Sequence, residues 1–223
     1  MDRRIKIITG HYGSGKSEFS VNYALKLRQE VEGKLALSDL DVINVYFRSR
    51  ERKKELEEKG IHVISSSIDA PNLDVPALSA EIHTPLLNKE YVNIIDLGGD
   101  NTGAKVMARY RDMVDPSECD MFFVVNANRE KTQTAQEVID YIKSVESASG
   151  LKVTGLINNT HMLKNTTLED IEKGQQVCIE VAKQLDIPIK YISCIESVAK
   201  EIPETFEGEV IPLKLFLRDS WMM

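Results

Sequence analysis

A glycine-rich run near the start of the chain has the residue types and spacing that bind phosphate groups. It reads Gly10-His11-Tyr12-Gly13-Ser14-Gly15-Lys16-Ser17 and matches the pattern GxxxxGK[ST]. Glycines let consecutive backbone N–H groups turn toward phosphate oxygens, and a helix that starts there adds its N-terminal dipole. We predict that Lys16 neutralises the terminal phosphates and that the Ser17 hydroxyl coordinates Mg²⁺. Glu18, the next residue, is included in the predicted nucleotide-binding site.

Two acidic segments supply the carboxylates that a magnesium–phosphate site needs. Asp96 ends an apolar run and is followed by Gly98 and Gly99. We predict that Asp96 binds Mg²⁺ at the carboxyl end of its strand, and that Gly99 lets a backbone N–H approach the terminal phosphate. Asp39 and Asp41 follow another apolar run, and on an extended backbone their side chains point the same way. We predict that Asp39 joins the outer shell of the metal and that Asp41 positions the attacking water; alternatively, both only form a turn.

Short apolar runs alternate with amphipathic stretches along the whole chain, as expected for a parallel sheet covered by helices. The predicted strands are Ile5–Thr9, Lys34–Ser38, Ile61–Ser65, Tyr91–Asp96, Met121–Asn126, Lys152–Asn158 and Ile189–Ser193. The clearest helical stripes contain Phe19, Tyr23, Leu27 and Val31, then Val138, Ile139, Ile142 and Val145, then Ile171, Cys178, Val181, Ala182 and Leu185. We therefore predict one domain over residues 1–223, with a three-layer α/β/α fold and a mostly parallel sheet of about seven strands.

Four segments give less regular signals. Thr166 and Glu169 have the spacing of a capping box before the third helical stripe. The charged run Arg48–Lys59 is typical of an exposed helix that ends at Gly60. The proline-bearing stretch Ile68–Asn88 has room for one helix near Val75–Ala80. The tail Val210–Leu217 alternates like an edge strand as much as a helix, and we expect it to dock on the body of the protein.

Composition excludes several classes of function. The 223 residues carry 28 Lys and Arg against 35 Asp and Glu, a net charge of -7, so direct binding to nucleic acid is not expected. No apolar run approaches the ~18–20 residues that a membrane span requires. The three cysteines, Cys119, Cys178 and Cys194, are far apart and show neither disulfide nor zinc-site spacing. These features are typical of a cytoplasmic protein.

Taken together, the motifs resemble those of the MinD/ParA/nitrogenase iron protein branch of the SIMIBI P-loop NTPases. The matching positions are Gly10, Gly13, Gly15, Lys16 and Ser17, then Asp39 and Asp41, then Asp96, Gly98 and Gly99, and finally the stretch Val153–Asn159. The resemblance implies ATP and Mg²⁺ as ligands, slow ATP hydrolysis used as a switch, and contact between Asn159 and adenine. A GTPase would carry the pattern NKxD, whereas Asn158-Asn159-Thr160-His161 contains no Asp.

One departure concerns the second residue of the loop. Family members that sandwich ATP between two subunits have a lysine there, and this chain has His11, followed by Tyr12 in place of a glycine. A neutral histidine donates a hydrogen bond but contributes no fixed charge. The resemblance still implies a nucleotide-dependent homodimer and an unknown protein partner. The alternative for both residues is that they only line the outer wall of the loop.

Two other functions use the same phosphate loop. A small-molecule kinase or ATP-dependent ligase would form an acceptor pocket from Ile68–Asn88, Arg109 and Arg111. An accessory NTPase for metallocentre assembly would hold a bridging metal through Cys119 or Cys194 in a dimer. Three further groups are weaker candidates for the site. Asn128 and Arg129 are candidates for contact with a partner or substrate, and Arg48 and Arg50 for contact with phosphate or an acidic partner. We expect Cys194–Val198 to form part of the wall around the adenine.

Overall fold

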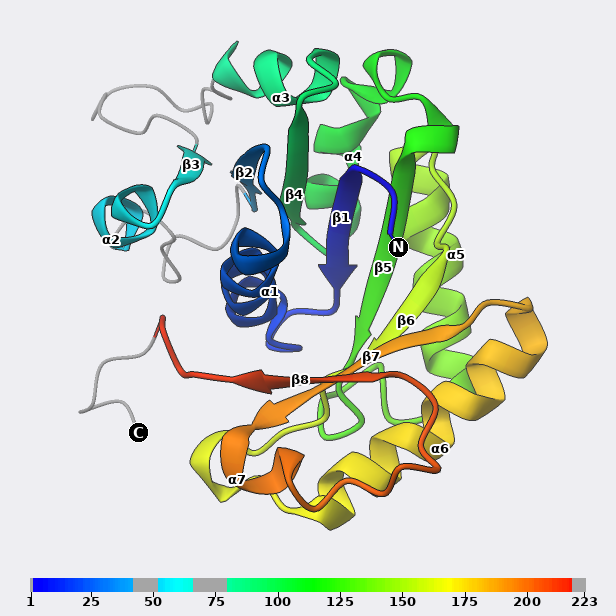
Figure 1. Ribbon diagram of the computed structural model, residues 1–223. Coiled ribbons are helices and arrows are strands. Elements are labelled where there is room, and N and C mark those ends of the chain that lie inside the picture. Colours follow the sequence, from blue (N-terminus) through cyan, green and yellow to red (C-terminus); the bar gives the residue numbers. More distant parts are fainter. Residues whose placement is uncertain (1, 42–51, 66–79, 218–223) are drawn as a thin grey trace, which may run out of the picture.

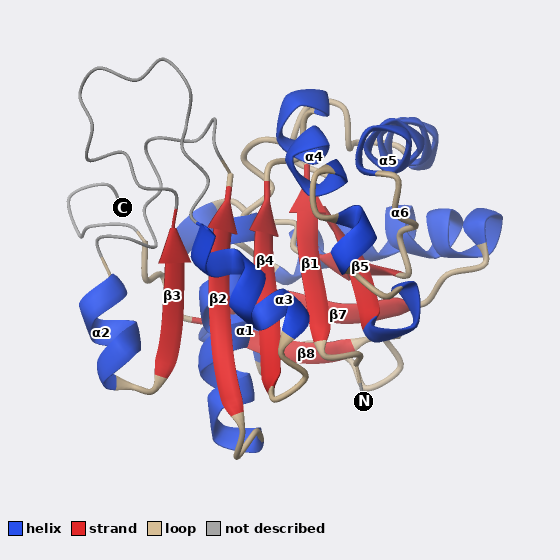
Figure 2. Cartoon of the chain, turned by 90° about the horizontal axis from the view of Figure 1, so that it is seen from above, coloured by secondary structure: helices blue, strands red, loops and turns tan. Residues whose placement is uncertain are grey.

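The structure, a computed structural model, describes residues 2–41, 52–65 and 80–217. Its strands form one eight-stranded sheet in the order β3-β2-β4-β1-β5-β6-β7-β8, and every neighbouring pair is parallel. Figure 2 shows β3, β2, β4, β1 and β5 side by side. The strands are β1 (Ile5–Gly10), β2 (Lys34–Leu40), β3 (Ile61–Ser65), β4 (Tyr91–Leu97), β5 (Cys119–Val125), β6 (Gly155–Asn158), β7 (Ile189–Ile195) and β8 (Glu209–Leu213). The predicted fold class is confirmed, and the alternating tail supplies the eighth strand at the sheet edge.

Helices cover both faces of this sheet. They are α1 (Lys16–Glu30), α2 (Lys53–Glu58), α3 (His83–Leu87), α4 (Asn101–Ala108), α5 (Ala135–Ser149), α6 (Leu168–Leu185) and α7 (Glu196–Ala199). Because side chains alternate along a strand, Ile7 of β1 packs into the core beneath α4 and α5, while Ile8 packs beneath α1. Figure 1 shows α1 and α5 on opposite sides of β1. The result is a three-layer α/β/α arrangement.

The parallel register brings the predicted site residues to one edge of the sheet. Asp39 of β2 lies opposite Asp96 of β4, and Gly10 of β1 lies opposite Val124 of β5. All these strands point the same way, so their carboxyl ends, and the loops that follow them, meet at that edge. Residues that are 57 and 114 positions apart in the sequence are thereby placed together.

Two local predictions need adjustment. The capping box of α6 is one residue later than predicted: Thr167 and Asp170 form it, because the Thr166 hydroxyl accepts the N–H of Met162 at 2.9 Å instead. The charged helix is α2, shorter than predicted, and Arg48 and Arg50 lie outside the described residues. The described part of the proline-bearing stretch contains α3 and a short 3-10 turn at Ala80–Ile82, and the helix predicted near Val75–Ala80 lies, apart from Ala80, outside the described residues. In the described ranges, no helix is long and apolar enough to cross a membrane.

Candidate functional site

The predicted phosphate loop joins β1 to α1 at the carboxyl edge of the sheet. Gly13 and Gly15 have positive φ angles of 74° and 87°, which side chains disfavour. A Cβ atom on Gly15 would lie 2.3 Å from the Asn159 amide nitrogen, so only glycine fits there. Gly15 caps α1 without a side-chain hydrogen bond, which leaves backbone N–H groups of the first turn available to an anion. The backbone thus has the form that phosphate binding requires.

The lysine of the loop meets an acid from the end of β2. Lys16 Nζ lies 3.6 Å from Asp41 Oδ2, and both side chains are largely buried. Asp39 Oδ1 accepts the N–H of Asp41 at 3.1 Å, which fixes the turn that carries Asp41. A Cβ on Gly98 would lie 3.2 Å from Asp41 Oδ1, so Asp41 also borders the loop after β4. The predicted catalytic residues are therefore in one place, although Asp39 also acts as a turn former.

Asp96 has the surroundings of a metal ligand. Burial and the neighbouring charges of Asp39 and Asp41 raise its pKa to about 7, although Lys16 and a hydrogen bond with Ser17 act in the opposite direction. Its Oδ1 atom is buried and, within the described residues, has no hydrogen-bond partner. A divalent cation would satisfy this oxygen and offset the buried charge.

The donor set fits Mg²⁺ shared with a nucleotide rather than a metal held by protein alone. In the described part of the chain, no group of three or more His, Cys, Asp and Glu side chains is placed to hold a metal ion. Mg²⁺ in phosphate sites is commonly bound by one or two protein oxygens together with phosphates and water. The Ser17 hydroxyl and the Asp96 carboxylate would supply those protein ligands.

Gly99 brings the loop after β4 against the phosphate loop. A Cβ atom on Gly99 would lie 1.8 Å from the carbonyl oxygen of Gly10, so the two backbones are in direct contact. The next residue, Asp100, caps α4 by accepting the N–H of Gly103 at 2.6 Å. This contact places the Gly99 backbone beside the loop, where the predicted approach to a terminal phosphate stays a prediction.

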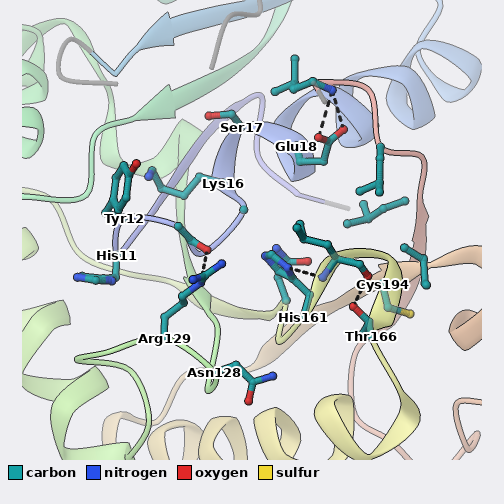
Figure 3. A pocket seen from close by; sticks show the side chains of 18 of the residues that line it. His11, Tyr12, Lys16, Ser17, Glu18, Asn128, Arg129, His161, Thr166 and Cys194 are labelled. Carbon is teal, nitrogen blue, oxygen red and sulfur yellow. Dashed lines mark hydrogen bonds between the residues drawn. The ribbon is translucent and has the colours of Figure 1, made fainter. Parts of the chain in front are cut away.

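A cavity of about 480 Å³ extends from the phosphate loop along the sheet edge (Figure 3). Lys16 and Ser17 lie at one end of its lining, and the other end is largely apolar. That apolar part is formed by Leu163, Cys194, Ile195, Leu213, Leu215 and Leu217. The volume is in the range of small-molecule sites, and a polar end beside an apolar end suits the phosphates and base of a nucleotide.

Asn159 lies in this cavity wall and is tied to the phosphate loop. Its Nδ2 donates to the Ser14 carbonyl oxygen at 2.6 Å, and its Oδ1 accepts the Ser193 hydroxyl at 2.8 Å. The side chain is buried. These bonds show a role in holding the loop, which the sequence did not suggest; contact with adenine stays a prediction.

His11 and Tyr12 face different surroundings. The His11 ring packs edge-on against Tyr141 of α5, with ring centroids 5.4 Å apart. Burial, together with Lys131 and Lys16, lowers the pKa of His11, so the ring is neutral near pH 7. Tyr12 is 65% exposed. Both residues border the cavity at its phosphate end, and His11 brings no fixed charge to it.

Arg129, a weak signal in the sequence, lies against the phosphate loop. Its Nε donates to the Gly13 carbonyl oxygen at 3.2 Å. The neighbouring Asn128 is fixed to α6 by Asp170 and Lys173, at 2.7 and 3.0 Å. Both Asn128 and Arg129 line the cavity, as does His161, which sequence reasoning did not single out.

The positions of Arg109 and Arg111 argue against the acceptor pocket of a kinase or ligase. A Cβ on Gly150, which caps the C-terminal end of α5, would lie 2.9 Å from Arg111 Cδ. The fifteen residues of α5 separate that end from the carboxyl edge of the sheet, about 22 Å away. Neither Arg109 nor Arg111 lines the cavity. Residues 66–79 of the proposed pocket lie outside the described residues.

The metal-bridging alternative also lacks support. All three cysteines are buried. Burial raises the pKa of Cys119 to about 12 and that of Cys194 to about 11, so both are thiols at neutral pH. Cys119 lies at the amino end of β5 and Cys194 near the carboxyl end of β7. Because the strands are parallel, the two cysteines lie at opposite ends of the strands.

No protein-family model matches this sequence, and no curated protein matches it significantly. Several solved structures share its fold. FtsY from Thermotoga maritima has a TM-score of 0.55 at 24% identity, over 86% of this chain and 62% of that chain. FtsY from Elizabethkingia anophelis, in complex with GDP, has a TM-score of 0.53 at 16% identity, over 97% and 61%. FlhF complexed with GTP and Mg²⁺ has a TM-score of 0.50 at 14% identity, over 79% and 62%.

This chain spans between 57% and 62% of the length of the FtsY structures. Sequence identities of 24% or less support a shared fold only. Together with the observed sheet and the glycine-rich loop between β1 and α1, the comparisons show that the chain has the three-layer α/β/α fold of a P-loop NTPase.

Proposed function

We propose that the chain is a Mg²⁺-dependent ATP-binding protein of the MinD/ParA kind, whose slow hydrolysis of ATP works as a conformational switch. The observation that carries this proposal is that Lys16 and Ser17 line the polar end of a cavity of nucleotide size and that the buried Asp96 carboxylate is hydrogen-bonded to Ser17. Phosphoryl transfer needs mainly positioning and charge stabilisation, which these groups supply.

In this proposal each residue has one task. Bound Mg²⁺ would neutralise charge on the phosphates, held by Ser17 and Asp96 with Asp39 behind them. Lys16 would leave Asp41 and pair with the phosphates, because a polyphosphate carries more charge than one carboxylate. Asp41 would then accept a hydrogen bond from water. The loops that carry Asp41 and Gly99 would respond together to the terminal phosphate, since the Gly99 backbone touches the phosphate loop.

We propose adenine as the base, from the carboxylates in the cavity lining. A guanine site offers a carboxylate to N1–H and the 2-amino group. Among the described residues, the carboxylates that line the cavity are Glu18 and Glu130. The Glu18 carboxylate accepts backbone N–H groups of Phe216 and Leu217, and the Glu130 charge acts on His11, at the phosphate end of the cavity. Two solved structures with this fold contain GDP or GTP, so ATP and GTP are titrated in parallel to identify the base.

We further propose a homodimer that forms with the triphosphate and recruits a protein partner. Exposed Tyr12, beside the phosphates, is suited to a contact that changes with the nucleotide. Neutral His11 cannot replace the charge of the lysine that related dimers use. Any partner-dependent activation therefore rests on other groups.

Molar mass by light scattering, combined with phosphate release, tests this proposal. We expect a doubled mass with Mg²⁺ and a non-hydrolysable ATP analogue, not with ADP, and loss of both dimer and turnover in Lys16→Ala. Arg111→Ala is the control, expected to behave as wild type. A constant mass, or turnover that survives Lys16→Ala, would contradict the switch. Loss of turnover in Arg111→Ala would instead favour the acceptor pocket of a kinase.

A further inference from the structure

A short segment after β8, residues 214–217, is fastened to the helix of the phosphate loop. The Glu18 carboxylate accepts the N–H of Phe216, and it accepts the N–H of Leu217 at 3.2 and 3.3 Å. The dashed lines at Glu18 in Figure 3 mark its bonds to Leu217. One turn further along α1, the Asn22 amide exchanges two hydrogen bonds with the Lys214 backbone, both of 2.9 Å. The segment is thus held along its whole length by side chains of α1.

The same segment forms the apolar end of the cavity. Leu213, Leu215 and Leu217 all line it. These leucines occupy alternate positions of the chain, and all three face the cavity. Phe216, between them, has its backbone bound on both sides: its N–H by Glu18 and its carbonyl oxygen by Arg52 Nε at 3.0 Å.

Glu18 itself is placed by the phosphate loop. It is the third residue of α1, two positions after Lys16 and directly after Ser17. Its carboxylate sits in the first turn, where the helix dipole favours a negative charge. Lys16 and Ser17 border the polar end of the cavity, and Glu18 holds the chain that walls the apolar end. One helix turn therefore organises both ends of the cavity.

We infer that Glu18 is a positioning residue for base binding, which it supports by fastening residues 214–217 as the wall against which the purine packs. The inference rests on the proposed nucleotide-binding function. It assigns Glu18 an indirect role: affinity for the nucleoside depends on this acid, while affinity for the phosphates does not. The purine ring would bury apolar surface against Leu213, Leu215 and Leu217.

The test compares a ligand that has a base with one that lacks it. Affinities for ATP and for tripolyphosphate are measured by calorimetry with Mg²⁺. In Glu18→Ala, ATP binding should weaken at least ~10-fold, while tripolyphosphate binding should stay within ~2-fold of wild type. Glu18→Gln retains one acceptor oxygen and should recover much of the ATP affinity. Glu30→Ala, in the last turn of the same helix, is the matched control and should change neither.

A second variant removes the wall without touching Glu18. Leu215→Ala should show the same selective loss of ATP affinity. This variant still tests the inference if circular dichroism shows that Glu18→Ala does not fold. Equal weakening of ATP and tripolyphosphate in these variants, or no change in either, would overturn the inference.

The failure of the proposed function gives a different result. If wild type binds neither ATP nor tripolyphosphate, the nucleotide site itself is wrong. If wild type prefers GTP, the proposed base is wrong, and the same selective loss is then sought with GTP.

Discussion

The ammonium group of Lys16 lies 3.6 Å from the carboxylate of Asp41, so the cation of the phosphate loop is paired with an acid from the end of β2. Both groups are shielded from solvent, which strengthens their attraction. A phosphate that enters the loop must compete with Asp41 for this lysine. The pair therefore links the occupancy of the loop to the position of Asp41.

Asp41→Asn should separate binding from hydrolysis. Removing the competing charge should tighten ATP binding by roughly 3- to 10-fold. Turnover should fall ~100-fold, because a neutral amide oxygen accepts a weaker hydrogen bond than a carboxylate and orients the attacking water less well. Nucleotide affinity and phosphate release measure the two effects, with Asp112→Asn, on the surface, as the control. Unchanged turnover would show that Asp41 does not position the water.

Asp96→Asn should stabilise the protein while it weakens Mg²⁺ binding. Burial raises the pKa of Asp96 from 3.8 to about 7, so at pH 8 the folded chain carries an unfavourable buried charge. Replacing it with a neutral amide should raise the free energy of unfolding by roughly 2 to 4 kcal/mol in EDTA. Urea unfolding measures this gain. Magnesium-dependent stabilisation by ATP should be lost, and a variant that retains it would show that Asp96 is not a ligand.

Asn159→Ala should weaken both ATP and tripolyphosphate. The Asn159 amide holds the Ser14 carbonyl at 2.6 Å and accepts the Ser193 hydroxyl at 2.8 Å, so its loss loosens the phosphate loop. We expect about 2 kcal/mol less stability and at least ~5-fold weaker binding of both ligands. A loss confined to ATP would identify Asn159 as a reader of the base alone.

Asp2 contributes stability that depends on pH. Burial opposes its ionisation, but Lys190 and the hydroxyl groups of Tyr191 and Tyr23 more than offset burial, so the pKa of Asp2 lies below its ordinary value. For an acid with a lowered folded pKa, the stabilisation is present above the unfolded pKa and is lost as pH falls through the folded pKa. Asp2→Asn should therefore cost about 1 kcal/mol at pH 7.

The pH series distinguishes this charge effect from simple packing. The difference between wild type and Asp2→Asn should be constant from about pH 7 to 5 and should shrink below about pH 4. Denaturant unfolding at each pH measures it. A difference that is the same at every pH would contradict a role for the Asp2 charge.

Most of the fold could be predicted because its signals are local. Strands buried on both faces appear as continuous apolar runs, and all seven predicted strands are present. The eighth was ambiguous, since Val210–Leu217 alternates like an edge strand as much as a helix. Its placement depends on pairing with β7 and on Asn22 and Glu18, which are nearly 200 positions away.

The candidate site likewise has a part that the sequence predicts and a part that it does not. The phosphate end is encoded in short motifs, and Lys16, Asp39, Asp41 and Asp96 are together as predicted. The apolar end is assembled from residues with no common spacing: Cys194, which was expected near the base, lines it, whereas Leu163 and Leu215 gave no signal in the sequence. The contact of Asn159 with the phosphate loop was hidden for a similar reason, because its partners Ser14 and Ser193 come from separate loops and strands.

Calorimetric titration of Mg²⁺ and ATP into wild type and Lys16→Ala, with GTP titrated in parallel, tests whether this chain binds ATP through its phosphate loop. We expect saturable ATP binding by wild type, at least ~10-fold weaker binding of GTP, and at least ~100-fold weaker ATP binding by Lys16→Ala. Absence of ATP binding by wild type, equal or tighter binding of GTP, or full ATP affinity in Lys16→Ala would contradict this expectation.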